Sequence, residues 1–146
     1  MTTRTAYTLE LRRVIAADVE AVFDAWTQPD HIKRWSAPEG MEIPVSEVDL
    51  TVGGRFVLQM QNPEGGKHTA RGIYHEVERP RRLVYTWSWD EHPDHGESLI
   101  TVDFRAVDGG TEVVMVHSGH PDEKSMTDHE GGWESCLNRL EGLYAG

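Results

Sequence analysis

The spacing of hydrophobic positions in the first third of the chain predicts one strand followed by two short helices. Residues 7–15 alternate between apolar and polar side chains, which is the pattern of a half-buried strand. After Asp18 the apolar positions recur every three or four residues, so we expect a helix that Asp18 caps and Pro29 ends. Residues 29–35 predict a second short helix.

The hydrophobic positions then recur at every second residue again, and strands are predicted over most of the chain between positions 41 and 117. The predicted strands cover residues 43–50, 55–60, 70–77, 83–89, 98–104 and 111–117. Short connections rich in glycine and proline separate them, which is typical of hairpins. Hairpin connections favour an antiparallel sheet over a parallel sheet with crossover helices.

The end of the chain returns to helical spacing. Apolar residues lie at i, i+4, i+7 and i+11, namely Trp133, Leu137, Leu140 and Tyr144. We expect this helix to begin near Ser125 or Thr127, where Thr127 and Glu130 form a possible capping box. Gly131 and Gly132 lie directly before the tryptophan, although each glycine costs a helix about 1 kcal/mol. Either a strand approaches closely there, or the space beside Trp133 is left open.

Length, charge and cysteine content narrow the class of protein. A chain of 146 residues predicts one domain over residues 1–146, with an α+β fold in which the sheet curls around the last helix. The net charge of −11 argues against nucleic acid as a partner. No apolar leader or membrane span is apparent, and the single cysteine, Cys136, excludes a disulfide within the chain. We therefore expect a cytoplasmic protein without a cofactor.

Eight histidines raise the question of a metal site. Two stretches, residues 91–97 and 117–123, place histidines among acidic residues, but neither has a zinc-ligand spacing and no cysteine accompanies them. We interpret both stretches as solvated loops or strand ends, and predict no metal. His117 differs because the alternation turns it inward, either as a core residue or as a partner facing a cavity.

Five stretches in order resemble one known family and cover nearly the whole chain. They are AADVEAVFDAWTQPDHIKRW, VDLTVGGRF, GIYHEVERPRRLVYTW, TVDFRAVDGGTEVVMVHSGH and GGWESCLNRLEGLY. The chain resembles the START/Bet v 1-like helix-grip superfamily (SRPBCC), in the branch similar to the C-terminal domain of the activator of Hsp90 ATPase. The resemblance implies a curved seven-stranded antiparallel sheet around a long C-terminal helix, with two short helices between strands 1 and 2.

The resemblance also implies an apolar cavity between sheet and helix. The wall positions that it implies are Trp35, Tyr74, Tyr85, Trp87, His117 and Trp133. Inward alternation and the helical stripe add Phe56, Phe104, Met115 and Leu137. Burial alone would also explain these side chains as a solid core, which is the default interpretation.

Three functions are compatible with this resemblance. The first is binding of a small hydrophobic molecule, aromatic or lipid-like, by a monomer or homodimer. The second is a cyclase- or dehydratase-like enzyme with His117 as acid–base and Tyr74 or Tyr85 as donor. The third is a co-chaperone with a protein partner, although the full activator has a further N-terminal domain for which this chain has no room.

Overall fold

The structure is a computed structural model that describes residues 7–37 and 40–144. Its elements, in chain order, are β1 (Leu9–Ile15), α1 (Val19–Thr27), α2 (Pro29–Ile32), β2 (Glu42–Val48), β3 (Arg55–Gln61), β4 (Lys67–Glu78), β5 (Arg82–Trp89), the 3₁₀ turn η1 (Pro93–His95), β6 (Ser98–Val107), β7 (Gly110–Ser118) and α3 (Glu123–Tyr144). The predicted strands and helices are therefore present in the predicted order.

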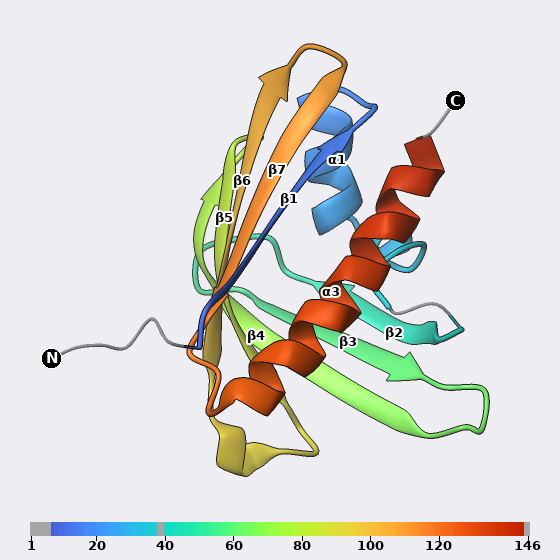
Figure 1. The fold of residues 1–146 in the computed structure, drawn as a ribbon, viewed down its shortest axis with the longest axis vertical. Coiled ribbons are helices and arrows are strands. Elements are labelled where there is room, and N and C mark those ends of the chain that lie inside the picture. Colours follow the sequence, from blue (N-terminus) through green and yellow to red (C-terminus); the bar gives the residue numbers. More distant parts are fainter. Residues whose placement is uncertain (1–6, 38–39, 145–146) are drawn as a thin grey trace, which may run out of the picture.

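The seven strands form one antiparallel sheet in the order β1-β7-β6-β5-β4-β3-β2. The register shifts in β2 between Glu42 and Val45, and in β4 between Tyr74 and Glu76. Such bulges increase the local twist and bend a strand. The strands β2 and β4 carry these bulges, and Figure 1 shows a sheet that is curved rather than flat.

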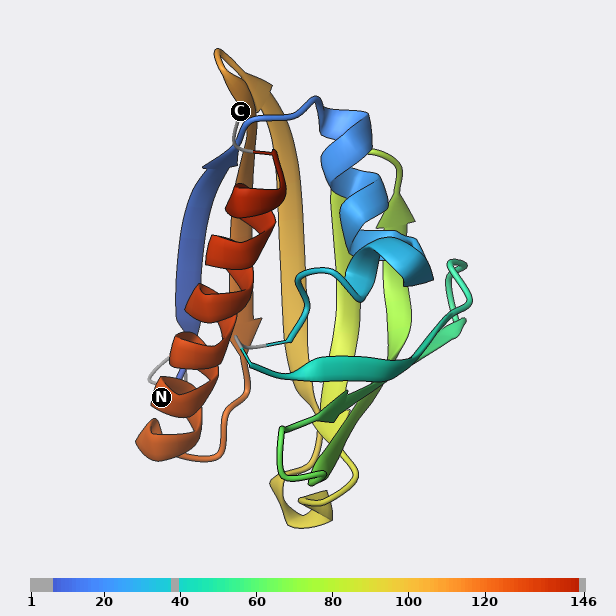
Figure 2. The same ribbon diagram turned by 90° about the vertical axis from the view of Figure 1, so that its right-hand side faces the viewer.

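The helix α3 crosses the concave face of this sheet, and α1 and α2 cover the other end of the same face (Figures 1 and 2). The fold is the predicted α+β helix-grip arrangement. Two boundaries were predicted wrongly. α3 begins at Glu123 rather than near Ser125 or Thr127, because Asp122 Oδ1 accepts the Ser125 amide at 2.8 Å and acts as the cap. The second helix, α2, ends at Ile32.

The end of the molecule under α1 is closely packed. Asp18 caps α1 as predicted, with its Oδ1 accepting the Ala21 amide at 2.8 Å. The rings of Phe23 and Phe104 meet edge to face at 5.4 Å. The buried Trp26 indole N–H donates to Tyr85 Oη at 3.0 Å, although the two residues are 59 positions apart in the sequence. This buried donor therefore has a hydrogen-bond partner. This packing fixes α1 on the sheet.

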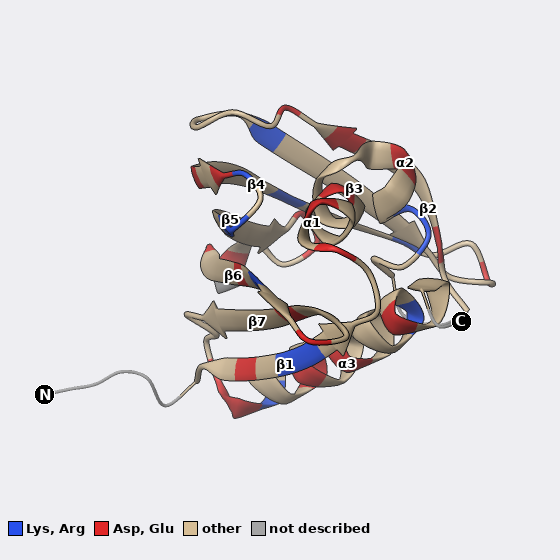
Figure 3. Ribbon diagram, turned by 90° about the horizontal axis from the view of Figure 1, so that it is seen from above, with Lys and Arg blue, Asp and Glu red and all other residues tan. Residues whose placement is uncertain are grey.

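The stripe of α3 enters the core as its spacing predicts. Leu137 and Leu140 are fully buried, and Trp133 is 6% exposed. On the sheet, Gly72 allows β4 and β5 to approach, since a Cβ at this position would lie 1.9 Å from the Thr86 carbonyl oxygen. Charged residues lie on many elements, with Lys and Arg interspersed among Asp and Glu (Figure 3).

Candidate functional site

A cavity of about 630 Å³ lies between the N-terminal half of α3 and the β3–β5 part of the sheet. Its wall is built from tryptophan and sulfur-containing side chains: Trp87, Trp89, Trp133, Met41, Met60 and Cys136. The rings of Trp87 and Trp89 meet at 5.5 Å, and those of Trp87 and Trp133 at 5.3 Å. These contacts join β5 and α3 into one aromatic surface, in which Trp87 is the shared member.

Polar residues complete the wall. They come from the β3–β4 hairpin, from the loop after β5, from the residue that caps α3 and from α3 itself, and include Asn62, His68, His92, Asp122, Lys124 and Asp128. Lys124 Nζ and Asp128 Oδ2 form an ion pair at 2.8 Å, so the charges of this pair largely cancel. The cavity therefore combines an apolar aromatic part with a polar part.

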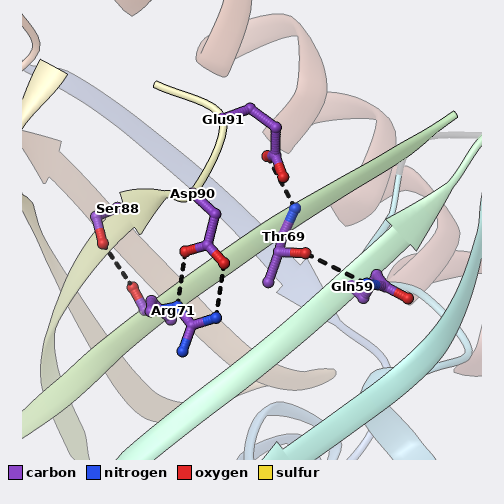
Figure 4. A network of polar contacts seen from close by, with 6 residues as sticks. All are labelled: Gln59, Thr69, Arg71, Ser88, Asp90 and Glu91. Atoms are coloured by element: carbon purple, nitrogen blue, oxygen red, sulfur yellow. Dashed lines mark hydrogen bonds and ion pairs between the residues drawn. The ribbon is translucent and has the colours of Figure 1, made fainter. Parts of the chain in front are cut away.

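The loop that carries His92 is held by a polar network on β3, β4 and β5 (Figure 4). Asp90 accepts two hydrogen bonds from Arg71, at 2.7 and 2.6 Å. This pairing lowers the pKa of Asp90 below its ordinary value. Glu91 accepts the Thr69 amide at 3.0 Å, and Gln59 donates to the Thr69 hydroxyl at 3.4 Å. The chain leaving β5 is thus tied to β4 directly before it reaches the cavity wall.

The structure shows what surrounds the two adjacent glycines that precede Trp133 in α3, Gly131 and Gly132. A Cβ built at Gly131 or Gly132 meets no heavy atom of the described chain within 4 Å, apart from the neighbours and helix backbone that any such Cβ touches. Close approach of a strand therefore does not explain either glycine. Gly132 lies in the cavity wall, whereas Gly131 is exposed. The missing side chain at position 132 leaves this part of the cavity open.

Next to the aromatic wall lies a group of three imidazoles, His117, His120 and His129, here called the histidine cluster, of which His129 itself lines the cavity. The ring centroids of His117 and His120 are 4.2 Å apart, those of His120 and His129 are 4.8 Å apart, and those of His117 and His129 are 5.2 Å apart. They come from β7, from the β7–α3 connection and from α3. The prediction of a solvated stretch at 117–123 is wrong for His120, which is 5% exposed.

Two tryptophan N–H groups fix the protonation of this cluster. The Trp133 indole donates to His117 Nδ1 at 3.1 Å, and an indole N–H can only donate, so the proton of the neutral ring is on Nε2. That Nε2 donates to Ser98 Oγ at 2.7 Å. The Trp89 indole likewise donates to His129 Nε2 at 2.9 Å, which leaves His129 Nδ1 to donate to the Ser125 carbonyl at 2.7 Å.

The cluster favours neutral imidazoles. Burial, and then the neighbouring rings of His120 and His129, lower the pKa of His117 well below its ordinary value. Burial and His129 lower the pKa of His120 to about 4, although a hydrogen bond with the His117 backbone opposes this change. At neutral pH the rings of His117 and His120 are therefore uncharged.

The ten side chains predicted as cavity wall lie in three places. Trp87 and Trp133 line the cavity, and both are also near a second void of about 20 Å³ that Trp35, Phe56, Tyr74 and Tyr85 surround. A void of this volume has room for about one water molecule. Phe104, Met115, His117 and Leu137 are buried in the core, and none of these four is in the described wall of the cavity.

Several wall residues were not singled out from the sequence, notably Met41, Met60, His129 and Cys136. His129 had a usable signal, because it precedes Trp133 by one helical turn and therefore shares its face of α3. Burial raises the pKa of the Cys136 thiol to about 12, so this wall residue is a thiol rather than a thiolate at neutral pH.

Two further properties concern metals and membranes. Within residues 7–37 and 40–144, no group of three or more His, Cys, Asp or Glu side chains is arranged to hold a metal ion. His117 and His129 use both of their ring nitrogens for hydrogen bonds to protein groups, whereas His120 Nε2 is buried without a hydrogen-bond partner among the described residues. Over the same described ranges, no helix has both the length and the apolarity needed to cross a membrane.

Solved structures with the same architecture include a protein from Chromobacterium violaceum, which is 30% identical over 94% of this chain and 96% of its own, with a TM-score of 0.85. The AHSA1 protein from Silicibacter pomeroyi is 27% identical over 93% of this chain and 96% of its own, with a TM-score of 0.82. An AHSA1-like protein from Aeromonas hydrophila is 28% identical over 92% and 90%, with a TM-score of 0.77.

A search of curated proteins gave no significant match. The sequence profile of one family, described as Activator of Hsp90 ATPase homolog 1-like protein, matches residues 16–145. This region runs from the turn after β1 through α3 and includes every described residue of the cavity wall. With this match and the shared helix-grip architecture, the chain belongs to the activator of Hsp90 ATPase homolog 1-like family.

Proposed function

We propose that the protein binds a small hydrophobic, aromatic molecule in the cavity between α3 and β5. The observation that carries this proposal is an aromatic cavity of about 630 Å³ that a glycine in the adjoining helix keeps open. Ligand pockets commonly measure about 300–1,000 Å³ and have mainly apolar walls with a few polar groups. The volume and the wall both fit this class.

The wall chemistry favours a flat, weakly polar guest. The N–H groups of Trp89 and Trp133 donate to histidines of the cluster, so these two indoles offer the cavity ring surface and no free hydrogen-bond donor. The buried N–H of the third wall tryptophan, Trp87, has no hydrogen-bond partner among the described residues, so it is the one indole that a weakly polar guest could satisfy. Met41 and Met60 add flexible thioethers, which adapt to irregular shapes and contact aromatic rings favourably. An aromatic molecule would displace water from apolar surface, which is the dominant favourable term in such binding.

The enzyme and co-chaperone alternatives stay predictions. An acid–base role for His117 requires its imidazole to reach a bound molecule. In the structure His117 is fully buried, and its two ring nitrogens pair with Trp133 and Ser98. The described contacts of His117 thus favour a structural role, and binding without turnover is the simpler proposal.

The test is a titration with N-phenyl-1-naphthylamine, an uncharged fluorescent probe whose emission rises in apolar surroundings. We expect saturable binding at pH 7.5 and quenching of tryptophan emission, since three tryptophans line the cavity. Competition with a flavanone, a fatty acid and a polyketide-like aromatic would then rank the ligand classes, and we expect the aromatic compounds to compete best.

Backbone chemical-shift mapping locates the bound probe. We expect saturable shifts at residues 87–89 and in the N-terminal half of α3. The amides of α1 are the internal control, because α1 packs over the closed end of the sheet and contributes no residue to the described wall. Absence of saturable shifts with every compound, or shifts spread evenly over α1 and α3, would refute the proposal.

A further inference from the structure

The histidine cluster connects the cavity wall to the three elements that meet at its base. His117 is on β7, His120 is in the connection that follows β7, and His129 is on α3. Their hydrogen bonds reach Trp133 on α3 and Trp89 on β5, two of the tryptophans of the cavity wall. The cluster therefore holds the N-terminal half of α3 against the sheet at the site where we propose that the ligand binds.

These hydrogen bonds exist only while the imidazoles are neutral. A protonated ring carries N–H on both nitrogens and cannot accept from an indole. Protonation of His117 would break its bond with Trp133, and protonation of His129 would break its bond with Trp89. In addition, two or three charged rings with centroids 4.2–5.2 Å apart would repel one another strongly in a site of low dielectric.

The other groups near the cluster do not provide a full set of countercharges. Asp122, Lys124 and Asp128 share the cavity wall with His129 on the α3 side, and His68 and His92 share it from β4 and the loop after β5. Asp122 caps α3, and the Asp128 carboxylate pairs with Lys124 at 2.8 Å. Lys124 and, to a smaller extent, His129 lower the pKa of Asp128, so this carboxylate is a partial countercharge for His129 alone. From β5 and β6 the neighbours of the cluster are Trp87, Trp89 and Ser98, which carry no charge.

The two halves of α3 are held differently. Its C-terminal half is fixed by Leu137 and Leu140, which are fully buried, and by the hydrogen bond from Arg139 to the Ala37 carbonyl. Apolar burial of this kind does not depend on protonation. Loss of the histidine contacts would therefore loosen the N-terminal half of α3 first, and that half forms one wall of the cavity.

We infer that the histidine cluster is a proton-operated latch: its neutral rings hold the N-terminal half of α3 on β5 and β7, and protonation releases this half and widens the cavity. One consequence of this inference rests on the proposed function: a bound aromatic molecule should dissociate faster in acid.

The direction follows from the pKa values. Burial and the neighbouring rings lower the pKa of His117, and the pKa of His120 falls to about 4, whereas an exposed histidine titrates near about 6.5. A group with a lowered pKa stabilises the closed form above the ordinary pKa, and this stabilisation is lost as the pH falls toward the lowered value. The latch is closed at pH 7.5, and opening becomes easier between about pH 6.5 and 4.

The first experiment uses the whole protein without ligand. Long-range proton–nitrogen correlation spectra of ¹⁵N-histidine at pH 7.5 should show the Nε2–H form of His117 and the Nδ1–H form of His129. Amide hydrogen exchange is then followed from pH 7.5 to 4.5. We expect the opening constant of residues 125–133 to rise at least about tenfold per pH unit below 6.5, which is the expected dependence when opening takes up one proton.

A pair of variants isolates the cluster. His120→Phe keeps a ring and removes one titrating group. We therefore expect the opening constant of residues 125–133 to rise less steeply in acid than in the wild type, by about a factor of ten per pH unit. His75→Phe is the control, because His75 is exposed on β4. If residues 125–133 exchange with the same pH dependence as residues 136–141, or if the three rings titrate near 6.5 while α3 stays protected, the latch is refuted.

Release of the bound probe separates the latch from the proposed function. Dissociation of N-phenyl-1-naphthylamine should accelerate in the pH range in which α3 opens. A probe that fails to bind at any pH contradicts the proposed function, and the latch is then tested by the hydrogen-exchange data alone. A probe that binds but dissociates equally fast at pH 7.5 and 5.5, although α3 opens, contradicts control of the cavity by the latch.

Discussion

Replacing the glycine of the cavity wall by leucine tests the origin of the open volume. Gly132→Leu places a side chain at the wall, and Gly131→Leu places the same side chain one residue earlier, where the helix is exposed. Both positions lie within α3, and a Cβ at either one meets no heavy atom of the described structure within 4 Å beyond its own helix and neighbours. The two variants therefore differ in the direction of the new side chain, and not in backbone cost or in the room for the Cβ.

The magnitudes follow from this geometry. Alanine is better than glycine in a helix interior by about 0.8–1 kcal/mol and leucine ranks just below alanine, so both variants should gain somewhat less than about 1 kcal/mol in free energy of unfolding. For a domain of this size, 1 kcal/mol raises Tm by about 2–4 °C. Only Gly132→Leu should weaken binding of N-phenyl-1-naphthylamine, and we expect at least a tenfold loss, or about 1.4 kcal/mol.

Urea unfolding measures the stability of both variants, and the fluorescence titration measures their affinity for the probe. Two results would refute the reasoning. If Gly132→Leu destabilises the protein while Gly131→Leu stabilises it, then the space at position 132 is needed for packing. If both leucine variants bind the probe like the wild type, the open volume at position 132 takes no part in binding.

Three further predictions concern buried groups. Tyr85→Phe leaves the buried Trp26 indole without its acceptor and should lower the free energy of unfolding by about 1–3 kcal/mol, measured by urea; an unchanged midpoint would contradict this role. The pKa of His120, about 4, implies that the wild type loses roughly 3 kcal/mol of stability between pH 6.5 and 4 relative to His120→Phe, and parallel pH profiles would contradict it. Cys136, with a pKa of about 12, is a thiolate in only about one molecule in 10⁴ at pH 8, so iodoacetamide should label it slowly, and the bound probe should slow the labelling further. Labelling at the rate of a free thiol would contradict the burial of Cys136.

The geometry of the cluster required the tertiary structure. His117 and Trp133 are 16 residues apart, and Trp89 and His129 are 40 residues apart. No local pattern links such pairs, because sheet order and the crossing of α3 decide which side chains meet. His120 illustrates the difference: a histidine beside proline and acidic residues resembles a solvated loop, yet the chain turns inward there and buries it.

The sequence by itself determined the elements and their order, because the hydrophobic periods of two and of three to four residues are properties of each strand and helix alone. It also determined the fold, through stretches that cover nearly the whole chain. The tertiary structure decided where the inward aromatics form solid core and where they leave space. Tyr74, Tyr85 and Phe104 pack against one another or against α1, whereas Trp87 and Trp133 border the cavity. Alternation reports that a side chain faces inward, but the distance between sheet and helix decides whether anything fills the space opposite.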